Sequence, residues 1–229
     1  MRTLYLIPAR GGSKRLPGKN TKILGGKPLV MYSIEIARSL ASDADICIST
    51  DSEEIKNTAE ADGLKVPFLR PAILSSDVAG SREVVLHALD FYEEQGVHYD
   101  TVILLQPTSP FRETTHIKEM LKEYSPALDM VVSVKDAYHN PYFSLFEEDS
   151  SGWLRVSKPG FTREQSPKAY GYNGSVYVIN VNSIRKFDFG ELARIKKYVM
   201  DEVHSVDIDT PMDWWVAEKI ISESLWRGY

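Results

Sequence analysis

Cysteine is almost absent from this 229-residue chain, and no Asp or Glu occurs in its first 34 positions. The single cysteine, Cys47, lies in an apolar run, so no internal disulfide can form and we interpret it as a buried structural thiol. No apolar run approaches the length of a membrane span, and the one at 4–8 is too short for the core of a signal peptide. These absences favour a protein of the reducing cytoplasm without a membrane segment.

The missing acidic residues leave a segregated charge. The first 34 residues contain seven Lys or Arg, whereas the other 195 contain 20 basic and 32 acidic residues, which gives −12 there and −5 for the whole chain. No basic stripe with interleaved aromatic residues is present, which argues against a duplex nucleic-acid partner. With 43% hydrophobic residues, the chain can form one substantial core. We therefore expect a globular protein that binds a small anion at its amino-terminal edge.

Short apolar runs alternate with amphipathic segments along most of the chain. Runs typical of strands buried on both faces occur at 4–7, 45–49, 65–68, 101–105 and 130–134. Segments with helical spacing occur at 29–40, 53–62, 82–95 and 114–124, and Gly63 and Gly96 follow two of them as helix stops. This order predicts an α/β fold with a doubly wound, mostly parallel, Rossmann-like sheet that binds ligands at the carboxyl ends of its strands.

The alternation stops after residue 134. Residues 139–146 and 153–156 are typical of two strands around an acidic turn at 147–152, and we expect a small projecting hairpin there. Its aromatic side chains must be buried against the body or against another subunit, and we favour a dimer contact. These side chains are Tyr142, Phe143, Phe146 and Trp153.

The sheet is expected to resume at 174–179 and to end at 205–209, before a last helix that extends through 218–225. Thr210, Pro211 and Asp213 suit the cap, the first and the third position of that helix.

Asp207 and Asp209 are two residues apart in the last expected strand. Both carboxylates would then point to one face, where they can share one hard cation such as Mg²⁺. The local sequence leaves open that Asp209 only accompanies the helix start and that Asp207 faces solvent. The position at a strand end before a helix favours the metal site.

The loop after the first expected strand, residues 7–20, combines glycines with cations. Gly11 and Gly12 would let the backbone approach a ligand without interference from Cβ, and four cations could neutralise a triphosphate. These cations are Arg10, Lys14, Arg15 and Lys19. The order matches neither a Walker loop nor the dinucleotide pattern. We interpret the loop as a nucleoside triphosphate site rather than a solvated turn, and we expect Lys19 to be exposed.

This loop closely resembles the signature of the acylneuraminate cytidylyltransferases, the CMP-sialic acid synthetases. Later blocks resemble that family in the same order, so the resemblance covers nearly the whole chain. They are Arg70-Pro71 with Leu74-Ser75-Ser76-Asp77 and Ser81, residues 105–112, residues 172–177 and residues 207–210. The neighbouring Kdo cytidylyltransferases have a similar loop but usually carry Pro at the position of Asn20, which favours nine-carbon acids.

The resemblance implies transfer of CMP from CTP to the anomeric hydroxyl of an N-acylneuraminic (sialic) acid, with release of pyrophosphate. The same reaction on legionaminic, pseudaminic or Kdo acid is an alternative, and so is a non-catalytic nucleotide-binding protein. It also implies that Asp207 and Asp209 bind a catalytic Mg²⁺. We expect a single domain, 1–229, in which 137–172 is an inserted element for dimerisation and acceptor binding, and a homodimer. The residues expected to act in catalysis are Arg10, Lys14, Lys19 and Asp209.

The resemblance assigns the other site residues as well. CTP would contact Arg10, Gly11, Gly12, Ser13, Lys14, Lys19 and Asn20, with Arg70 and Ser81 beside the cytidine. The sugar acid would contact Gln106, Ser109, Arg163, Gln165 and Tyr172, with Tyr170 and Asn173 close by. Many family members have an acidic residue where this chain has Ser166, which leaves the choice of sugar open.

Two further sets of residues are less telling. Asp51 could cap the next helix or touch the ligand. The five histidines show no spacing typical of metal ligands, and we interpret them as structural or surface residues.

Overall fold

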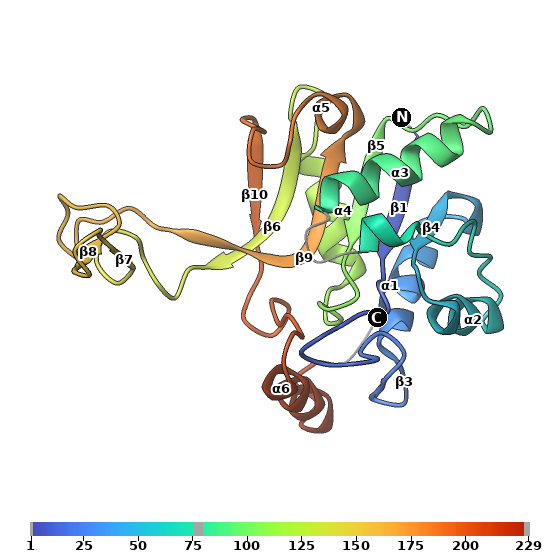
Figure 1. The fold of residues 1–229 in the computed structure, drawn as a ribbon, viewed down its shortest axis with the longest axis horizontal. Helices are drawn as coiled ribbons and strands as arrows, with labels where there is room; N and C mark the ends of the chain where they lie inside the picture. The colour runs from blue at the N-terminus through green and yellow to red at the C-terminus, as the bar shows by residue number, and fades with distance from the viewer. Residues whose placement is uncertain (1, 76–79, 227–229) are drawn as a thin grey trace.

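A six-stranded sheet forms the centre of the computed structural model, which describes residues 2–75 and 80–226. In spatial order its strands are β10 (Ile195–Val199), β6 (Met130–Asp136), β9 (Tyr170–Asn180), β5 (Thr101–Leu105), β1 (Thr3–Pro8) and β4 (Ile46–Ser49). β9 runs antiparallel to both of its neighbours, whereas the other pairs are parallel. The prediction of a mostly parallel sheet is therefore confirmed (Figure 1).

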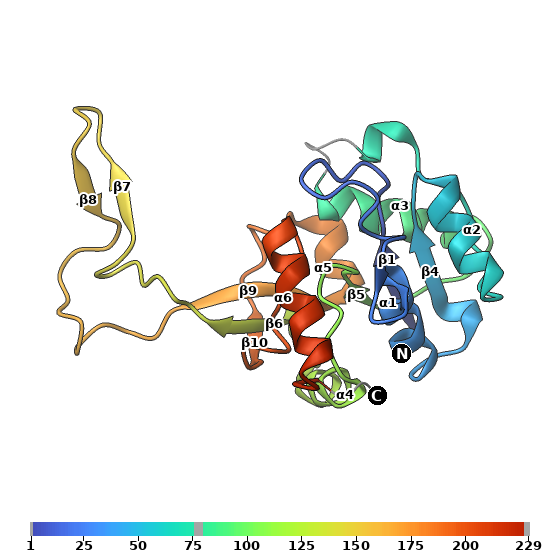
Figure 2. The ribbon, with the colours of Figure 1, turned by 90° about the horizontal axis from the view of Figure 1, so that it is seen from below.

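Helices cover both faces of this sheet (Figure 2). Alternate residues of a strand point to opposite faces, so Leu4 and Leu6 of β1 lie in one buried cluster and Tyr5 and Ile7 in the other. The first cluster includes residues of α3 (Ser81–Glu93) and α5 (Val181–Lys186). The second includes residues of α1 (Leu29–Arg38), α2 (Glu53–Ala61) and α4 (Thr114–Glu123). The predicted doubly wound arrangement is confirmed.

A third buried cluster joins the two ends of the chain. Leu16 and Leu24 from the amino-terminal region pack in it with Ile208 and with Trp214 of α6 (Pro211–Ser222). The short strands β2 (Ile23–Leu24) and β3 (Lys27–Pro28) form a small hairpin beside it. This packing places the loop after β1 next to the segment before α6, although nearly 190 residues separate them.

The start of α6 confirms the predicted cap. The Thr210 side chain accepts a hydrogen bond from Asp213 N, the Asp213 side chain accepts one from Thr210 N, and Pro211 is the first helical residue. The helix ends at Ser222, short of the predicted end at 225.

Two expected strands are absent from the described residues. Residues 65–68 form no ladder, and their vicinity contributes only a bridge between Thr50 and Leu69, because Pro67 cannot donate to a neighbouring strand. Residues 202–205 form a turn, and 206–209 pair with no strand; instead Ile208 N donates to Thr108 O at 2.8 Å. The prediction of strands at 65–68 and 205–209 is therefore wrong.

Several short elements were not expected from the sequence, and β2, β3 and α5 are among them. The edge strand β10 has two exposed lysines, so its sequence lacks the alternation of apolar and polar residues that is typical of a strand. Lysines at this position also protect an open sheet edge from pairing with another strand. Single 3₁₀ turns precede β4, at η1 (Asp43–Asp45), and follow the bridge at Leu69, at η2 (Ala72–Ser75).

Residues 137–169 leave the sheet as a long arm (Figures 1 and 2). β6 and β9 stay paired as far as Asp136 and Tyr170, and the arm then carries a hairpin of β7 (Phe146–Glu148) and β8 (Leu154–Val156). The strand expected at 139–146 is wrong over most of its length, because 141–144 form a turn on the carbonyl of Asn140. Trp153 is 66% and Phe146 is 50% exposed, so the body does not bury them.

No helix among the described residues combines the length and the apolar character that a bilayer crossing requires.

Candidate functional site

A cavity of about 320 Å³ lies at the carboxyl ends of β1 and β5, beside the segment that precedes α6. This is the edge at which a doubly wound sheet binds its ligands. Nine of the predicted site residues line it: Arg10, Ser13, Lys19, Asn20, Arg70, Ser81, Gln106, Asp207 and Asp209. The structure therefore brings together residues from five separate parts of the chain.

Two further cavities adjoin the central one. A cavity of about 420 Å³ shares Lys19 and Asp209 with it and adds the predicted Lys14. A cavity of about 520 Å³ on the other side shares Ser81 with it and adds the predicted Tyr172. The three cavities thus adjoin one another through shared lining residues, with the cations at one end and Tyr172 at the other.

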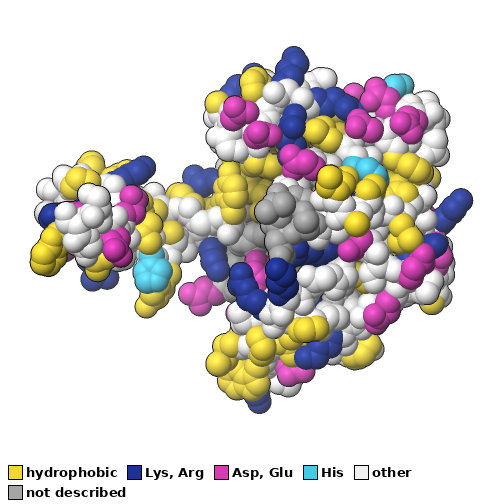
Figure 3. Space-filling view, viewed as in Figure 1, with side chains coloured by type: hydrophobic (Ala, Val, Ile, Leu, Met, Phe, Trp, Pro, Cys, Tyr) yellow, Lys and Arg dark blue, Asp and Glu magenta, His cyan; other side chains and the backbone are white. Residues whose placement is uncertain are grey.

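Lys19 connects the basic loop with the carboxylates. Its Nζ donates to Asp209 Oδ1 at 2.9 Å and to Ile208 O at 2.7 Å. Lys19 is only 7% exposed, so the prediction of an exposed residue is wrong. The ammonium group is bonded to the carbonyl of Ile208, which itself belongs to the third buried cluster, so the contact between the two ends of the chain accompanies the burial of Lys19. Figure 3 shows Lys and Arg side chains gathered around an acidic one between the sheet and α6.

Asp207 has a carboxylate oxygen that no described residue satisfies. Burial raises the pKa of Asp207, a hydrogen bond from Thr108 opposes this, and the charge of Asp209 adds to it. Its Oδ1 is buried and accepts no hydrogen bond within the described ranges. A desolvated carboxylate with an unshared oxygen is unfavourable alone but is a ready ligand for a hard cation. Asp207 and Asp209 therefore fit a divalent cation such as Mg²⁺, although their segment is not the strand that the sequence suggested.

Asp51 holds the basic loop and does not cap the next helix. Gly11 N donates to Asp51 Oδ1 at 2.9 Å, while the side chain of Ser52 caps α2. A Cβ on Gly11 would lie 2.9 Å from the Ser52 Cβ, so glycine is needed here for packing against α2. Gly12 has open space around it, and neither glycine lines the three cavities. The approach of these glycines to a ligand stays a prediction.

Two buried polar side chains face the central cavity. Arg70 is 5% exposed, donates to Ser75 Oγ at 3.1 Å and lies 3.9 Å from Asp51, and burial lowers its pKa while that carboxylate opposes the effect. Asn20 donates through Nδ2 to Arg10 O, and its Oδ1 is buried without a partner among the described residues. Such incompletely satisfied groups can be completed by a ligand. Ser76 and Asp77 of the neighbouring block lie outside the described residues.

The residues predicted to contact the sugar acid lie in four different places. Gln106 lines the central cavity, and Tyr172 lines the cavity of about 520 Å³. Ser109 is fully buried behind them and donates through Oγ to a backbone carbonyl of β9. Arg163 and Gln165 are exposed on the arm, which Figures 1 and 2 show extending away from the body. Within one chain, these two residues do not reach the cavities.

The sequence analysis assigned no site role to several residues that line the second cavity, among them Arg82, Tyr177, Asp188 and Phe189. The two aromatic rings give it an apolar wall, and Arg82 Nε lies 3.3 Å from Asp188 and donates to Ile184 O. Arg82 belongs to α3 and Tyr177 to β9, whereas Asp188 and Phe189 directly follow the short helix α5. Because α5 was not expected, its surroundings could not be assigned.

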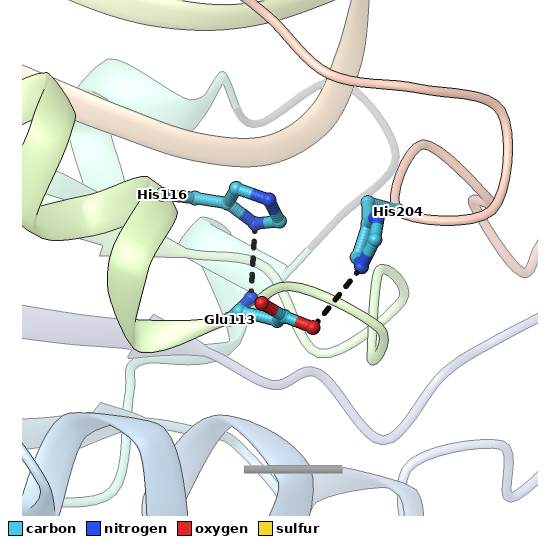
Figure 4. Close-up of side chains that lie close together, drawn as sticks. All are labelled: Glu113, His116 and His204. Atoms are coloured by element: carbon cyan, nitrogen blue, oxygen red, sulfur yellow. Dashed lines mark hydrogen bonds and ion pairs between the residues drawn. The ribbon is translucent and has the colours of Figure 1, made fainter. Parts of the chain in front are cut away.

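A second polar cluster lies at the start of α4 (Figure 4). Glu113 Oε1 is 3.3 Å from His204 Nε2, Glu113 N donates to His116 Nδ1, and His204 Nδ1 lies 2.8 Å from Asp201. By composition Glu113, His116 and His204 could hold a cation, which their spacing in the sequence did not indicate. The Nδ1 lone pair of His116 is already used in the helix cap, however. We therefore interpret the cluster as a clamp between α4 and the loop 200–205.

Comparison with known sequences agrees with this geometry. Residues 4–143 match the family model described as cytidylyltransferase. The chain is 36% identical over 228 residues to CMP-N,N'-diacetyllegionaminic acid synthase of Legionella pneumophila, covering 96% of this chain and 97% of that protein. It is also 36% identical over 225 residues to N-acylneuraminate cytidylyltransferase of Escherichia coli, covering 95% of this chain and 52% of that protein. The chain thus spans about half the length of the second relative.

Solved structures share the fold. CMP:2-keto-3-deoxy-manno-octonic acid synthetase complexed with CTP aligns with a TM-score of 0.72 at 18% identity, covering 98% of this chain and all of that one. 4-Diphosphocytidyl-2C-methyl-D-erythritol synthase from Anaerococcus prevotii aligns with a TM-score of 0.66 at 10% identity, covering 96% and 98%. At such identities the likeness shows the fold alone. Because the family model matches more than half of the chain and the relatives match nearly all of it, this chain belongs to the cytidylyltransferase family.

Proposed function

We propose that this protein transfers CMP from CTP to the anomeric hydroxyl of an N-acylneuraminic (sialic) acid or a related nonulosonic acid, with release of pyrophosphate. The observation that carries the proposal is the contact of 2.9 Å between Lys19 and Asp209, which places the basic loop and the carboxylates around one cavity. Relatives named for legionaminic, sialic and pseudaminic acid support CTP and a nine-carbon acid as the substrates.

The reaction needs stabilisation of charge rather than a protein nucleophile. The anomeric oxygen attacks the α-phosphorus of CTP, and the bond from that phosphorus to pyrophosphate breaks. Negative charge then develops on the non-bridging oxygens and on the leaving group. Arg10, Lys14 and Lys19 line the two cavities at the basic loop, where they would hold the triphosphate and neutralise that charge. The second cavity would hold the acceptor against Tyr172 and Tyr177.

We assign Mg²⁺ to Asp207 and Asp209. A bound Mg²⁺ would screen the phosphate charges and make the α-phosphorus more electrophilic. The buried Oδ1 of Asp207, which has no hydrogen-bond partner among residues 2–75 and 80–226, supports the assignment.

We also propose a homodimer formed through the arm. Its exposed apolar residues, Phe146, Trp153 and Leu154, form a surface that a partner would bury. A partner that receives the arm could take Arg163 and Gln165 into its own acceptor site, which would reconcile their predicted role with their distance from the cavities of their own chain.

We place the reaction in the cytoplasm, where CTP is available. Cys47 is buried as predicted, and burial raises the pKa of its thiol to about 12, so this thiol is unreactive.

An acceptor panel tests the proposed reaction. The purified protein is incubated with CTP, Mg²⁺ and one acid at a time, namely N-acetylneuraminic, diacetyllegionaminic, pseudaminic or Kdo acid, and pyrophosphate is measured. We expect release with at least one nine-carbon acid and little with ATP in place of CTP. Binding of CTP without release for any acid would contradict the proposal and favour a non-catalytic nucleotide-binding protein.

Mixing two inactive variants tests the role of the arm. Asp209→Ala and Arg163→Ala proteins are each assayed alone and after mixing under conditions that allow subunit exchange. If the arm acts on the partner, each mixed dimer has one complete site, and about a quarter of the wild-type activity should return. No recovery despite proven exchange would contradict action across the dimer.

A further inference from the structure

Asp207 lies on a segment with few backbone contacts of its own. Residues 206–209 belong to no strand or helix, and the turn 202–205 connects them to β10. The backbone hydrogen bond from Ile208 N to Thr108 O ties the segment to the loop after β5. A metal ligand on such a segment needs side-chain contacts to stay in place, because outer partners orient the ligands that bind the metal.

Asn173 supplies such contacts from β9. Its side chain is 2% exposed, and Nδ2 donates to Ser205 Oγ at 3.0 Å and to Met200 Sδ at 3.3 Å. These two partners lie at opposite ends of the loop that connects β10 to the Asp207 segment. Ser205 is itself buried, so its hydroxyl depends on protein partners.

The other end of the same amide is anchored in the sheet. Asn173 Oδ1 accepts from Ser133 Oγ at 2.6 Å and from Ser175 N at 3.2 Å. Ser133 lies where the register between β6 and β9 shifts, and its Oγ also accepts from Val176 N at 2.8 Å. At this irregularity in the β6–β9 pairing, the Asn173 side chain is free to bond to the loop that leads to Asp207.

The next residue, Gly174, has its Cβ position directed at the Asp207 carboxylate. Gly174 has a φ of +72°, and a Cβ there would lie 3.3 Å from Asp207 Oδ2 and 3.5 Å from Ser109 Oγ. The backbone of β9 therefore forms one wall of the position that Asp207 occupies.

We propose that Asn173 is a positioning residue that holds the Asp207 segment in place for the metal, rather than a residue that contacts the acceptor. This inference rests on the proposed function for the metal role of Asp207. Asn173 lines none of the three cavities, and the partners of its side chain lie within β6, β9 and the 200–205 loop.

Asn180 offers a matched control. It is a buried asparagine of the same strand at the opposite end of the sheet. Its Oδ1 accepts from Ser183 N, and its Nδ2 donates to the carbonyls of Pro126 and Leu128. Asn173→Ala and Asn180→Ala thus remove the same group and a similar set of bonds, but only Asn173 contacts the loop that leads to Asp207.

The test titrates Mn²⁺ by electron paramagnetic resonance into wild type and both variants, with CTP saturating, and records their thermal unfolding. We expect both variants to melt at lower temperature, and only Asn173→Ala to bind Mn²⁺ about tenfold more weakly. Unchanged Mn²⁺ affinity in Asn173→Ala, or equal weakening in Asn180→Ala, would overturn the inference. A rise in the acceptor KM alone, with normal Mn²⁺ binding, would also overturn it and indicate contact with the acceptor.

If Asn173→Ala does not fold, a milder variant can be tested instead. Ser205→Ala removes only the hydroxyl that links Asn173 to the segment, and it should weaken Mn²⁺ binding in the same direction; wild-type affinity would overturn the inference. The metal titration needs no acceptor, so it is independent of the proposed reaction. A wild type that releases no pyrophosphate would refute the reaction, whereas normal Mn²⁺ binding in these variants of an active enzyme would refute only the role of Asn173.

Discussion

Two aspartates at opposite ends of the central sheet have opposite environments. Asp129, before β6, accepts from Ser183 Oγ, from the Arg194 side chain and from the amides of Ala193 and Arg194. The Arg194 side chain above all holds the pKa of Asp129 well below its usual range. Asp207 has a raised pKa and an oxygen without a partner among the described residues. The first carboxylate is completed by the protein and stabilises the fold, whereas the second is left for a ligand.

Activity should separate these two aspartates most strongly. Asp207→Asn and Asp209→Ala should each lower the rate of pyrophosphate release by about 10³-fold, because each removes a charge that acts on the transition state. Asp129→Asn should keep most of the activity, since Asp129 is remote from the cavities. The rates are measured with CTP, Mg²⁺ and the best acceptor. Near-normal rates in a folded Asp209→Ala protein would refute its assigned role.

Thermal stability should separate the two aspartates in the reverse direction. At neutral pH and without ligands, Asp129→Asn should melt several degrees below wild type, because it loses charged hydrogen bonds. Asp207→Asn should melt at the wild-type temperature or higher, because it removes a desolvated charge. Calorimetry of both variants beside wild type measures this. Strong destabilisation by Asp207→Asn would show that its carboxylate is structural.

The pH dependence of these differences should have opposite signs. The folded pKa of Asp129 is lowered, so its contribution is complete above the ordinary value of 3.8 and is lost as the pH falls through the folded value. The folded pKa of Asp207 is raised, so its protonated form adds stability below 3.8, which is lost as the pH rises through the folded value. The advantage of Asp207→Asn over wild type should therefore grow from pH 4 to 7. Parallel curves for both variants would contradict this assignment.

Lys19 should affect both binding and stability at the site end of the sheet. Lys19→Met should weaken CTP binding by about tenfold or more, because a phosphate contact is lost, and should also lower the melting temperature, since Lys19 is buried and its bonds to Ile208 and Asp209 disappear. The exposed Lys22, which lines none of the cavities, is the control for charge, and Lys22→Met should bind CTP nearly as wild type does. Titration calorimetry measures both affinities, and equal affinities would place the triphosphate elsewhere.

The smallest effect is expected at Gly174. Gly174→Ala should cost about 1–2 kcal/mol of unfolding free energy, because the left-handed conformation disfavours a Cβ, and should weaken metal binding through its contact with Asp207. Gly171→Ala in the same strand is the control, since no atom lies within 4 Å of its Cβ position. Urea unfolding measures the free energy of unfolding of both variants, and Mn²⁺ titration measures their affinity for the metal. Identical behaviour would show that β9 does not constrain the carboxylate.

The alternation of apolar runs was sufficient to predict the body of the fold. Runs such as 101–105 are buried on both faces, and Gly63 and Gly96 end their helices in the left-handed conformation, as expected. The prediction of a strand at 65–68 was wrong because Pro67 opposes pairing. Strand β10 was missed because this edge strand carries exposed lysines. Local patterns report burial, but they do not report which strand lies at an edge.

The site could be predicted where charge and motif coincide, and less well where a residue acts through another. The basic loop and Asp207 with Asp209 lie together as expected. The roles of Asp51 beside Gly11 and of Asn173 beside Ser205 depend on contacts between distant segments, which no local pattern contains. The burial of Lys19 likewise accompanies a contact between the two ends of the chain.

The most direct test is a crystal structure with CTP and Mn²⁺, in which anomalous scattering locates the metal. We expect one Mn²⁺ bound by Asp207 and Asp209, with the triphosphate on Arg10, Lys14 and Lys19 in the adjoining cavities. A metal that avoids both aspartates, or a triphosphate that lies away from the basic loop, would contradict the account.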